Sequence, residues 1–106
     1  MEEKILTAKQ ISEFKLHLQR EEKSRNTIEK YMRDVSAFLT FTEGQMISRD
    51  FVINYKNRLI KENYAPRSIN SMLASLHSLF AFLGWEEFRV KTIRLQQQMY
   101  CSKEKN

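Results

Sequence analysis

Apolar residues recur at intervals of three and four along four stretches of the chain, which is the spacing of one face of an α-helix. The predicted helices follow Thr7, Ser24 and Ser48, and the last begins at Pro66; they end near residues 22, 42, 61–63 and 83. The clearest apolar stripe lies in the last helix and consists of Ile69, Met72, Leu73, Leu76, Phe80 and Leu83. The pattern therefore predicts an all-α fold, a small four-helix bundle.

Residues typical of helix ends support these boundaries. Thr7 is followed three residues later by Gln10, which is the spacing of a capping box. Pro66 stands where a first-turn proline is tolerated. Gly44 and Gly84 follow two of the helices, where a left-handed residue often ends a helix. The connections of about 4 to 6 residues are typical of neighbouring helices in a compact bundle.

The chain after the fourth helix has a weaker pattern. We expect Trp85 to fold back on the core, and residues 90–95 to form either a short fifth helix or an extended exit. Residues 1–94 are interpreted as one helical domain and residues 95–106 as a linker or disordered tail. Phe88 and Met99 are expected to be small apolar exposures against which a neighbouring subunit or a further domain packs.

Composition narrows the class of protein. The 106 residues include two Gly and one Pro, too few for the tight turns of a many-stranded β protein. The 18 Lys and Arg against 13 Asp and Glu give a net charge of +5, which permits a nucleic-acid partner without selecting one. The single cysteine, Cys101, fits a reducing compartment. Without a long apolar run or a signal-peptide core, the chain is expected to be cytoplasmic, with no membrane partner.

The polar face of the second predicted helix carries basic residues. They are Asn26, Lys30 and Arg33 on one stripe, with Lys23 and Arg25 at the helix N-terminus. Free N–H groups and the helix dipole at such a terminus favour an anion such as phosphate. The alternative is an ordinary solvated face on which Glu29 pairs with Arg33.

The fourth predicted helix has no acidic residue, since none occurs between Tyr64 and Trp85. Its outer face is expected to carry Arg67, Ser68, Asn70, Ser71, Ala74, Ser75, His77 and Ser78. Small side chains let another backbone come close, hydroxyl and amide groups donate to phosphate or base edges, and no carboxylate repels a polyanion. The face therefore fits nucleic acid and, equally, a second domain or subunit docked through small residues.

No catalytic site can be assembled from the sequence. His17 and Arg20 have the form His-x-x-Arg, but Leu18 between them belongs to the apolar stripe, and no further cation accompanies the pair. His17 and His77 lack Cys or acidic partners at metal-ligand spacing. Cys101 has no neighbouring His to activate it. We therefore expect no cofactor, no metal and no enzymatic activity in this chain.

Two motifs in order resemble the core-binding domain of tyrosine recombinases, the phage integrase and Xer-like family. The first is Ser24-Arg25-Asn26-Thr27-Ile28, then Tyr31, Asp34-Val35, Phe38-Leu39 and Phe41. The second is Ala65-Pro66-Arg67-Ser68-Ile69-Asn70, then Leu73, Leu76, Leu79-Phe80 and Phe82-Leu83, similar to the family's last long helix. The resemblance spans residues 8–90, although Ser68-Ile69 stands where the family often has Thr-Ile.

The resemblance implies a SAM-like helical domain that grips duplex DNA opposite a separate catalytic domain, with its second and fourth helices near the major groove. The expected DNA contacts, with Lys23 added from the charge pattern, are Lys23, Arg25, Asn26, Thr27, Lys30, Arg33, Arg67, Ser68, Asn70, Ser71 and Ser75. The implied partners are double-stranded DNA, the catalytic domain of the same recombinase and other recombinase subunits. We expect that catalytic domain to be absent from this chain, with Tyr100 in the linker. The alternative function is a helical protein–protein interaction module.

Overall fold

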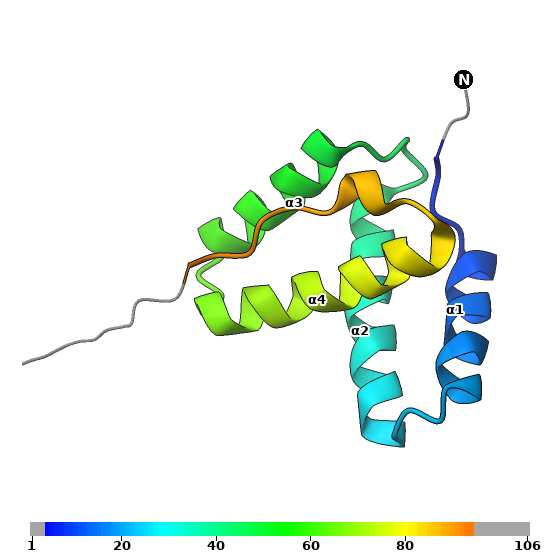
Figure 1. Ribbon diagram of the computed structural model, residues 1–106. Helices are drawn as coiled ribbons and strands as arrows, with labels where there is room; N and C mark the ends of the chain where they lie inside the picture. Colours follow the sequence, from blue (N-terminus) through cyan, green and yellow to red (C-terminus); the bar gives the residue numbers. More distant parts are fainter. Residues whose placement is uncertain (1–3, 95–106) are drawn as a thin grey trace, which may run out of the picture.

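The computed structural model describes residues 4–94, which form four α-helices followed by one short 3-10 helix (Figure 1). The elements are α1 (Ala8–Arg20), α2 (Arg25–Thr42), α3 (Arg49–Lys61), α4 (Pro66–Leu83) and η1 (Glu86–Phe88). No strand occurs in this part of the chain. The predicted all-α, four-helix fold is confirmed.

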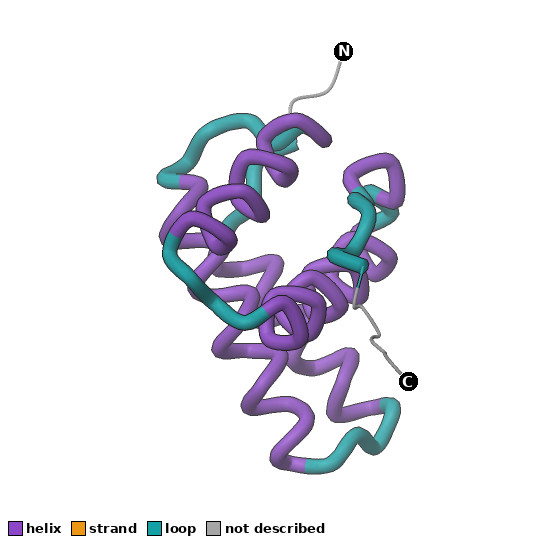
Figure 2. Tube along the Cα trace, turned by 90° about the vertical axis from the view of Figure 1, so that its left-hand side faces the viewer, coloured by secondary structure: helices purple, strands orange, loops and turns teal. Residues whose placement is uncertain are grey.

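The α2 and α4 helices form the centre of the molecule, where α4 crosses α2 (Figure 1). The α1 helix lies beside α2, and Figure 2 shows this antiparallel pair extending away from α4 to the loop that joins them. The α3 helix packs against α4 on the other side. The crossing of α2 and α4 therefore fixes where all four helices lie.

Side-chain caps hold the starts of three helices where the sequence predicts them. The Thr7 hydroxyl accepts a hydrogen bond from the Gln10 N–H at 3.3 Å, and Gln10 Oε1 accepts one from the Thr7 N–H at 2.9 Å. The hydroxyls of Ser24 and Ser48 each accept the N–H of the residue three positions later, at 3.1 Å. Each cap satisfies a backbone donor that has no partner inside the helix. The α1 helix ends slightly earlier than predicted, since the chain turns at residue 22 with a φ of 60°.

The core is centred on an aromatic cluster at the meeting point of α2, α3 and α4. Phe38 of α2 is fully buried, and its ring packs edge-on against Tyr55 of α3 at 5.0 Å and Phe80 of α4 at 6.0 Å between ring centroids. Edge-to-face pairs at this spacing are favourable for aromatic rings. The cluster therefore joins the three helices through one side chain.

The segment after α4 corrects one prediction and confirms another. Trp85 folds back on the core as expected. The expectation that Phe88 is exposed is wrong: its side chain is only 6% exposed, because its ring packs against Phe80 and Trp85, with centroids 5.8 Å away in both cases. No helix forms over residues 90–94, which run as the extended exit, the second of the two alternatives. The short 3-10 helix η1 lies earlier, at Glu86–Phe88, where none was predicted. Met99, Tyr100, Cys101 and the expected linker over residues 95–106 lie outside the described residues.

The extended segment 89–94, here called the strap, runs between α3 and α4 (Figure 1). Two α3 side chains bind its backbone: Arg49 Nε donates to the Arg89 carbonyl at 3.2 Å, and Lys56 Nζ donates to the Lys91 carbonyl at 2.9 Å. Both bonds use strap backbone rather than strap side chains. The side chains of Arg89 and Lys91 are therefore left exposed.

His77 of α4 also holds the strap, through a ring nitrogen that can take up a proton. Its Nε2 accepts a hydrogen bond from the Val90 N–H at 3.2 Å, which requires a ring nitrogen without a proton. Burial, and then the positive charge of Arg89, lower the pKa of His77 from its usual 6.5. Because the unfolded chain takes up the proton more readily, the stabilisation from neutral His77 is complete above the unfolded pKa and is lost as pH falls through the folded pKa.

We therefore predict that acidification destabilises the wild-type chain more than the variant His77→Gln, whose amide oxygen accepts the same bond without titrating. The measurement is the melting temperature of both proteins at several pH values between about 7.5 and 5.0, which spans the range where histidine titrates. The difference in melting temperature between wild type and His77→Gln should shrink or reverse toward low pH. Parallel curves would contradict the prediction.

Candidate nucleic-acid interface

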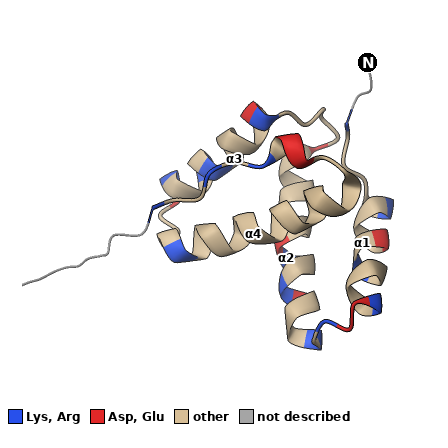
Figure 3. Cartoon of the chain, in the orientation of Figure 1, with Lys and Arg blue, Asp and Glu red and all other residues tan. Residues whose placement is uncertain are grey.

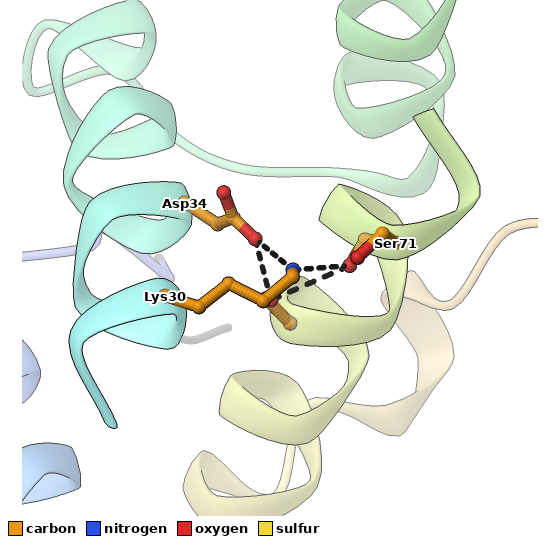
Figure 4. Close-up of polar contacts among 4 residues, drawn as sticks. Lys30, Asp34 and Ser71 are labelled. Carbon is orange, nitrogen blue, oxygen red and sulfur yellow. Dashed lines mark hydrogen bonds and ion pairs between the residues drawn. The ribbon is translucent and has the colours of Figure 1, made fainter. Parts of the chain in front are cut away.

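A polar network joins α2 to α4 at the centre of the predicted DNA-contact surface (Figure 4). Lys30 Nζ donates to Asp34 Oδ2 at 2.5 Å, to the Ser71 carbonyl at 3.2 Å and to Ser75 Oγ at 3.2 Å. Ser75 Oγ in turn donates to Asp34 Oδ2 at 2.7 Å. Lys30 and Ser71 therefore lie on the same side of the molecule, as a surface shared by both helices requires.

The network occupies all the donors of Lys30. An ammonium group has three N–H bonds, and the three acceptors around Lys30 Nζ match that number. Its charge is neutralised by Asp34, a carboxylate that is only 5% exposed. Lys30 therefore acts first as a bridge between α2 and α4, and its charge reaches the surface only in part.

The prediction that Ser75 lies on the outer face of its helix is wrong. Its side chain is fully buried, because the hydroxyl is enclosed between Lys30 and Asp34 of α2. A serine side chain is small enough to let two helix backbones cross closely, and its hydroxyl supplies the donor that a buried carboxylate needs. Ser75 thus faces α2 rather than a partner.

Asn70 also faces inward, toward the strap. Its Nδ2 donates to the Ile93 carbonyl at 2.8 Å and its Oδ1 accepts from the Ile93 N–H at 2.6 Å. The amide therefore makes two hydrogen bonds to one backbone unit. The expectation that Asn70 and His77 lie free on the outer face of α4 is wrong, because both bind the strap backbone.

Three further candidates, Arg33, Ser68 and Ser71, border a hollow of about 250 Å³ at the helix crossing, here called the α2–α4 groove. Its lining residues are Lys30, Arg33, Asp34, Tyr64, Ser68, Ser71 and Met72. Arg33 and Ser68 are exposed, and Arg33 makes no ion pair within residues 4–94. Sequence reasoning missed Tyr64, which is 44% exposed, because it lies in the loop before α4 and outside any periodic pattern.

The basic residues at the start of α2 lie in a different hollow, of about 490 Å³, between α1 and α2. It is lined by Lys15, Gln19, Lys23, Arg25, Ile28 and Glu29. Arg25 pairs with Glu29 at 3.1 Å, so the alternative pairing of Glu29 with Arg33 is wrong. Thr27 belongs to the cap, since its hydroxyl accepts from Ser24 at 2.9 Å. Asn26 and Arg67 are exposed.

The structure describes neither a metal centre nor a membrane helix. Within residues 4–94, no three His, Cys, Asp or Glu side chains lie together in a way that would hold a metal ion. Over the same residues, no helix is both long and apolar enough to cross a membrane. The hollow between the crossed helices α2 and α4 is lined by charged and hydroxyl-bearing residues together with Met72.

The comparison with family models identifies the class to which this small helical domain belongs. The chain belongs to the phage integrase, N-terminal SAM-like domain family, whose model matches residues 11–87. It is 34% identical over 87 residues to tyrosine recombinase XerA of Pyrococcus furiosus, covering 82% of this chain. It is also 34% identical over 82 residues to tyrosine recombinase XerA of Pyrococcus horikoshii, covering 77% of this chain.

The alignments cover only 30% and 28% of those two recombinases, so the chain spans less than a third of the length of the relatives it matches. No solved structure matches the chain. Family membership therefore rests on the family model and the two recombinases, and the fold agrees with it.

Proposed function

We propose that this domain binds duplex DNA at a recombination site, as the N-terminal part of a site-specific tyrosine recombinase. The contact is the α2–α4 groove and its rim, defined here as the exposed Arg67 beside Ser68 at the start of α4. A separate catalytic domain of the same recombinase would cleave and rejoin the strands, and other recombinase subunits would be further partners, all in the cytoplasm. The observation that carries the proposal is the contact of Lys30 with Ser71, since it places the polar faces of α2 and α4 at one groove.

The electrostatics of the groove favour a phosphodiester backbone. Arg33 and Arg67 are exposed and have no carboxylate partner within the described chain. Asp34 is the acidic residue that lines the groove, and Lys30 neutralises it at 2.5 Å. Arginine forks bind phosphate oxygens well, and the Ser68 hydroxyl adds a neutral donor. The groove thus offers positive charge and donors with little opposing charge.

The alternative of a protein-interaction module loses part of its support. That reading needs the small residues of the fourth helix to be free for a partner. Ser75 is buried against α2, and Ser71 contributes its carbonyl to Lys30. Ser75 therefore serves the crossing with α2 within this chain, whereas Ser68 and Ala74 stay exposed.

The test is the salt dependence of duplex binding for wild type and for Arg33→Gln with Arg67→Gln. Each phosphate neutralised contributes about −0.9 to the slope of log affinity against log salt, so the double variant should flatten the slope by about 1.8. A matched control is Lys9→Gln with Arg20→Gln, which removes one Lys and one Arg from the exposed face of α1. Equal slopes for the two double variants would contradict the assignment of the α2–α4 groove.

A further inference from the structure

A group of basic residues on α3 and the strap has no assigned role. They lack a carboxylate partner within residues 4–94 and are Arg49, Lys56, Arg89, Lys91 and Arg94. Figure 3 shows Lys and Arg along α3 and the strap, whereas α4 beyond its first turn carries neither. The α2–α4 groove and its rim have Arg33 and Arg67 as their unpaired cations, so more free charge lies on this second surface, here called the α3–strap surface.

The hydrogen bonds that hold the strap also align these cations. Arg49 reaches the backbone at Arg89, and Lys56, two helical turns further along α3, reaches the backbone at Lys91. The strap and α3 therefore run in the same direction, and their cations form two adjacent rows. Each α3 side chain gives one donor to the strap and keeps its charge and its other N–H groups.

Acidic residues do not neutralise the α3–strap surface. Glu87 pairs with Lys4 at 2.7 Å, and Glu62 pairs with Arg58 at 3.0 Å. Asp50 and Glu86 are exposed beside the start of the two rows, next to Arg49 and before the strap. The part of the surface that continues from Lys56 and Lys91 toward Arg94 therefore keeps its positive charge.

The α3–strap surface lies on a different side of α4 from the α2–α4 groove. The Asn70 side chain binds the strap, whereas the Ser75 side chain faces Lys30 and Asp34 of α2. Side chains five residues apart on an α-helix point about 140° apart, because each residue turns the helix by about 100°. The two surfaces thus lie on separate faces of the domain.

We propose that the α3–strap surface is a second contact for the phosphodiester backbone of duplex DNA. Residues 89–94 extend over about 16 Å at the rise of an extended chain. One strand of a duplex carries a phosphate about every 3.4 Å along the axis, so the row faces several phosphates at once. Lysine and arginine side chains bind phosphate oxygens, and such contacts position a protein on the duplex without reading its sequence. This inference deepens the proposed function and rests on it.

The experiment compares three double variants of the 106-residue chain in duplex binding at several salt concentrations. They are Lys91→Gln with Arg94→Gln, Arg33→Gln with Arg67→Gln, and the α1 control Lys9→Gln with Arg20→Gln. Each double variant removes two positive charges, either one Lys and one Arg or two Arg. All the changed side chains are exposed, so melting temperatures should stay close to wild type. The strap variant is expected to flatten the salt slope by about 1.8, and the α1 control by much less.

The outcomes separate the two proposals. If the strap variant has the same salt slope as the α1 control, the α3–strap surface is overturned. A flatter salt slope in the Arg33 and Arg67 variant then still supports the α2–α4 groove. If only the strap variant has a flatter salt slope, the α3–strap surface is supported and the groove is overturned as the main contact. If both of these variants have flatter salt slopes and the α1 control does not, both the α3–strap surface and the α2–α4 groove are supported as DNA contacts.

Discussion

Replacing Phe38 by alanine is expected to lower the free energy of unfolding by about 3–5 kcal/mol, the cost of deleting a buried aromatic ring and leaving a cavity. Phe38 is fully buried, and its ring touches aromatic rings from both α3 and α4. These rings come from different helices, so the cavity cannot close by moving one side chain. A domain of this size is stable by only about 5–15 kcal/mol, so Phe38→Ala removes a large share of it.

Urea denaturation of wild type, Phe38→Ala and Leu16→Ala measures this effect. Leu16 lies on α1 and is 51% exposed, so its truncation should change the free energy of unfolding by no more than about 0.5 kcal/mol. The slope of the unfolding free energy against urea concentration should stay similar among the three proteins, because the same surface is exposed on unfolding. A Phe38→Ala loss as small as that of Leu16→Ala would contradict the core described above.

The helices could be predicted from the sequence because their signals are local. Thr7 and Gln10 are three residues apart and form the capping box by themselves. Pro66 and Gly84 bound α4 through properties of their own backbones, namely a fixed φ and freedom at a φ of 77°. The apolar stripes predict which side of each helix is buried. None of these steps needs a distant partner.

The polar residues of α4 could not be placed in the same way, because distant partners decide their positions. Ser75 is buried by Asp34, 41 residues away, and Asn70 is bound by Ile93, 23 residues further along. A serine that faces solvent and one that faces a buried carboxylate look the same in a helical pattern. Phe88 was misplaced for a related reason, since three residues of η1 give no periodic signal.

One signal for the buried network was present in the sequence. Asp34 lies three residues after Tyr31 and four before Phe38, so it falls on the apolar stripe of α2. An acidic residue at such a position needs a partner, and Lys30 stands four residues before it. That reasoning would have removed Lys30 from the free cations and indicated a donor from another helix. It would not have identified the donor as Ser75.

The second large effect is expected from Asp34→Ala. Removing this carboxylate leaves the buried Ser75 hydroxyl with only the Ser71 carbonyl, at 3.4 Å, as acceptor, and it leaves Lys30 without a counter-charge. Breaking a buried ion pair from one side costs about 3–5 kcal/mol, but Lys30 is 33% exposed and can turn partly to water. We therefore expect a loss of about 2–3 kcal/mol, a fall in melting temperature of about 10–20 °C for a domain of this size.

The matched variant Asp34→Asn separates charge from shape. Asparagine keeps an oxygen that accepts from Ser75 but cannot neutralise Lys30, so the stability loss should be smaller than for alanine. In Asp34→Asn the α2–α4 groove gains one net positive charge, so duplex affinity at low salt should rise. Asp34→Ala should instead lower the affinity, because it loosens the helix crossing. If Asp34→Ala stays within about 0.5 kcal/mol of wild type, the network does not hold α2 to α4. If Asp34→Asn instead weakens duplex binding with stability kept, the groove does not face phosphate, because extra positive charge beside a polyanion can only strengthen the attraction.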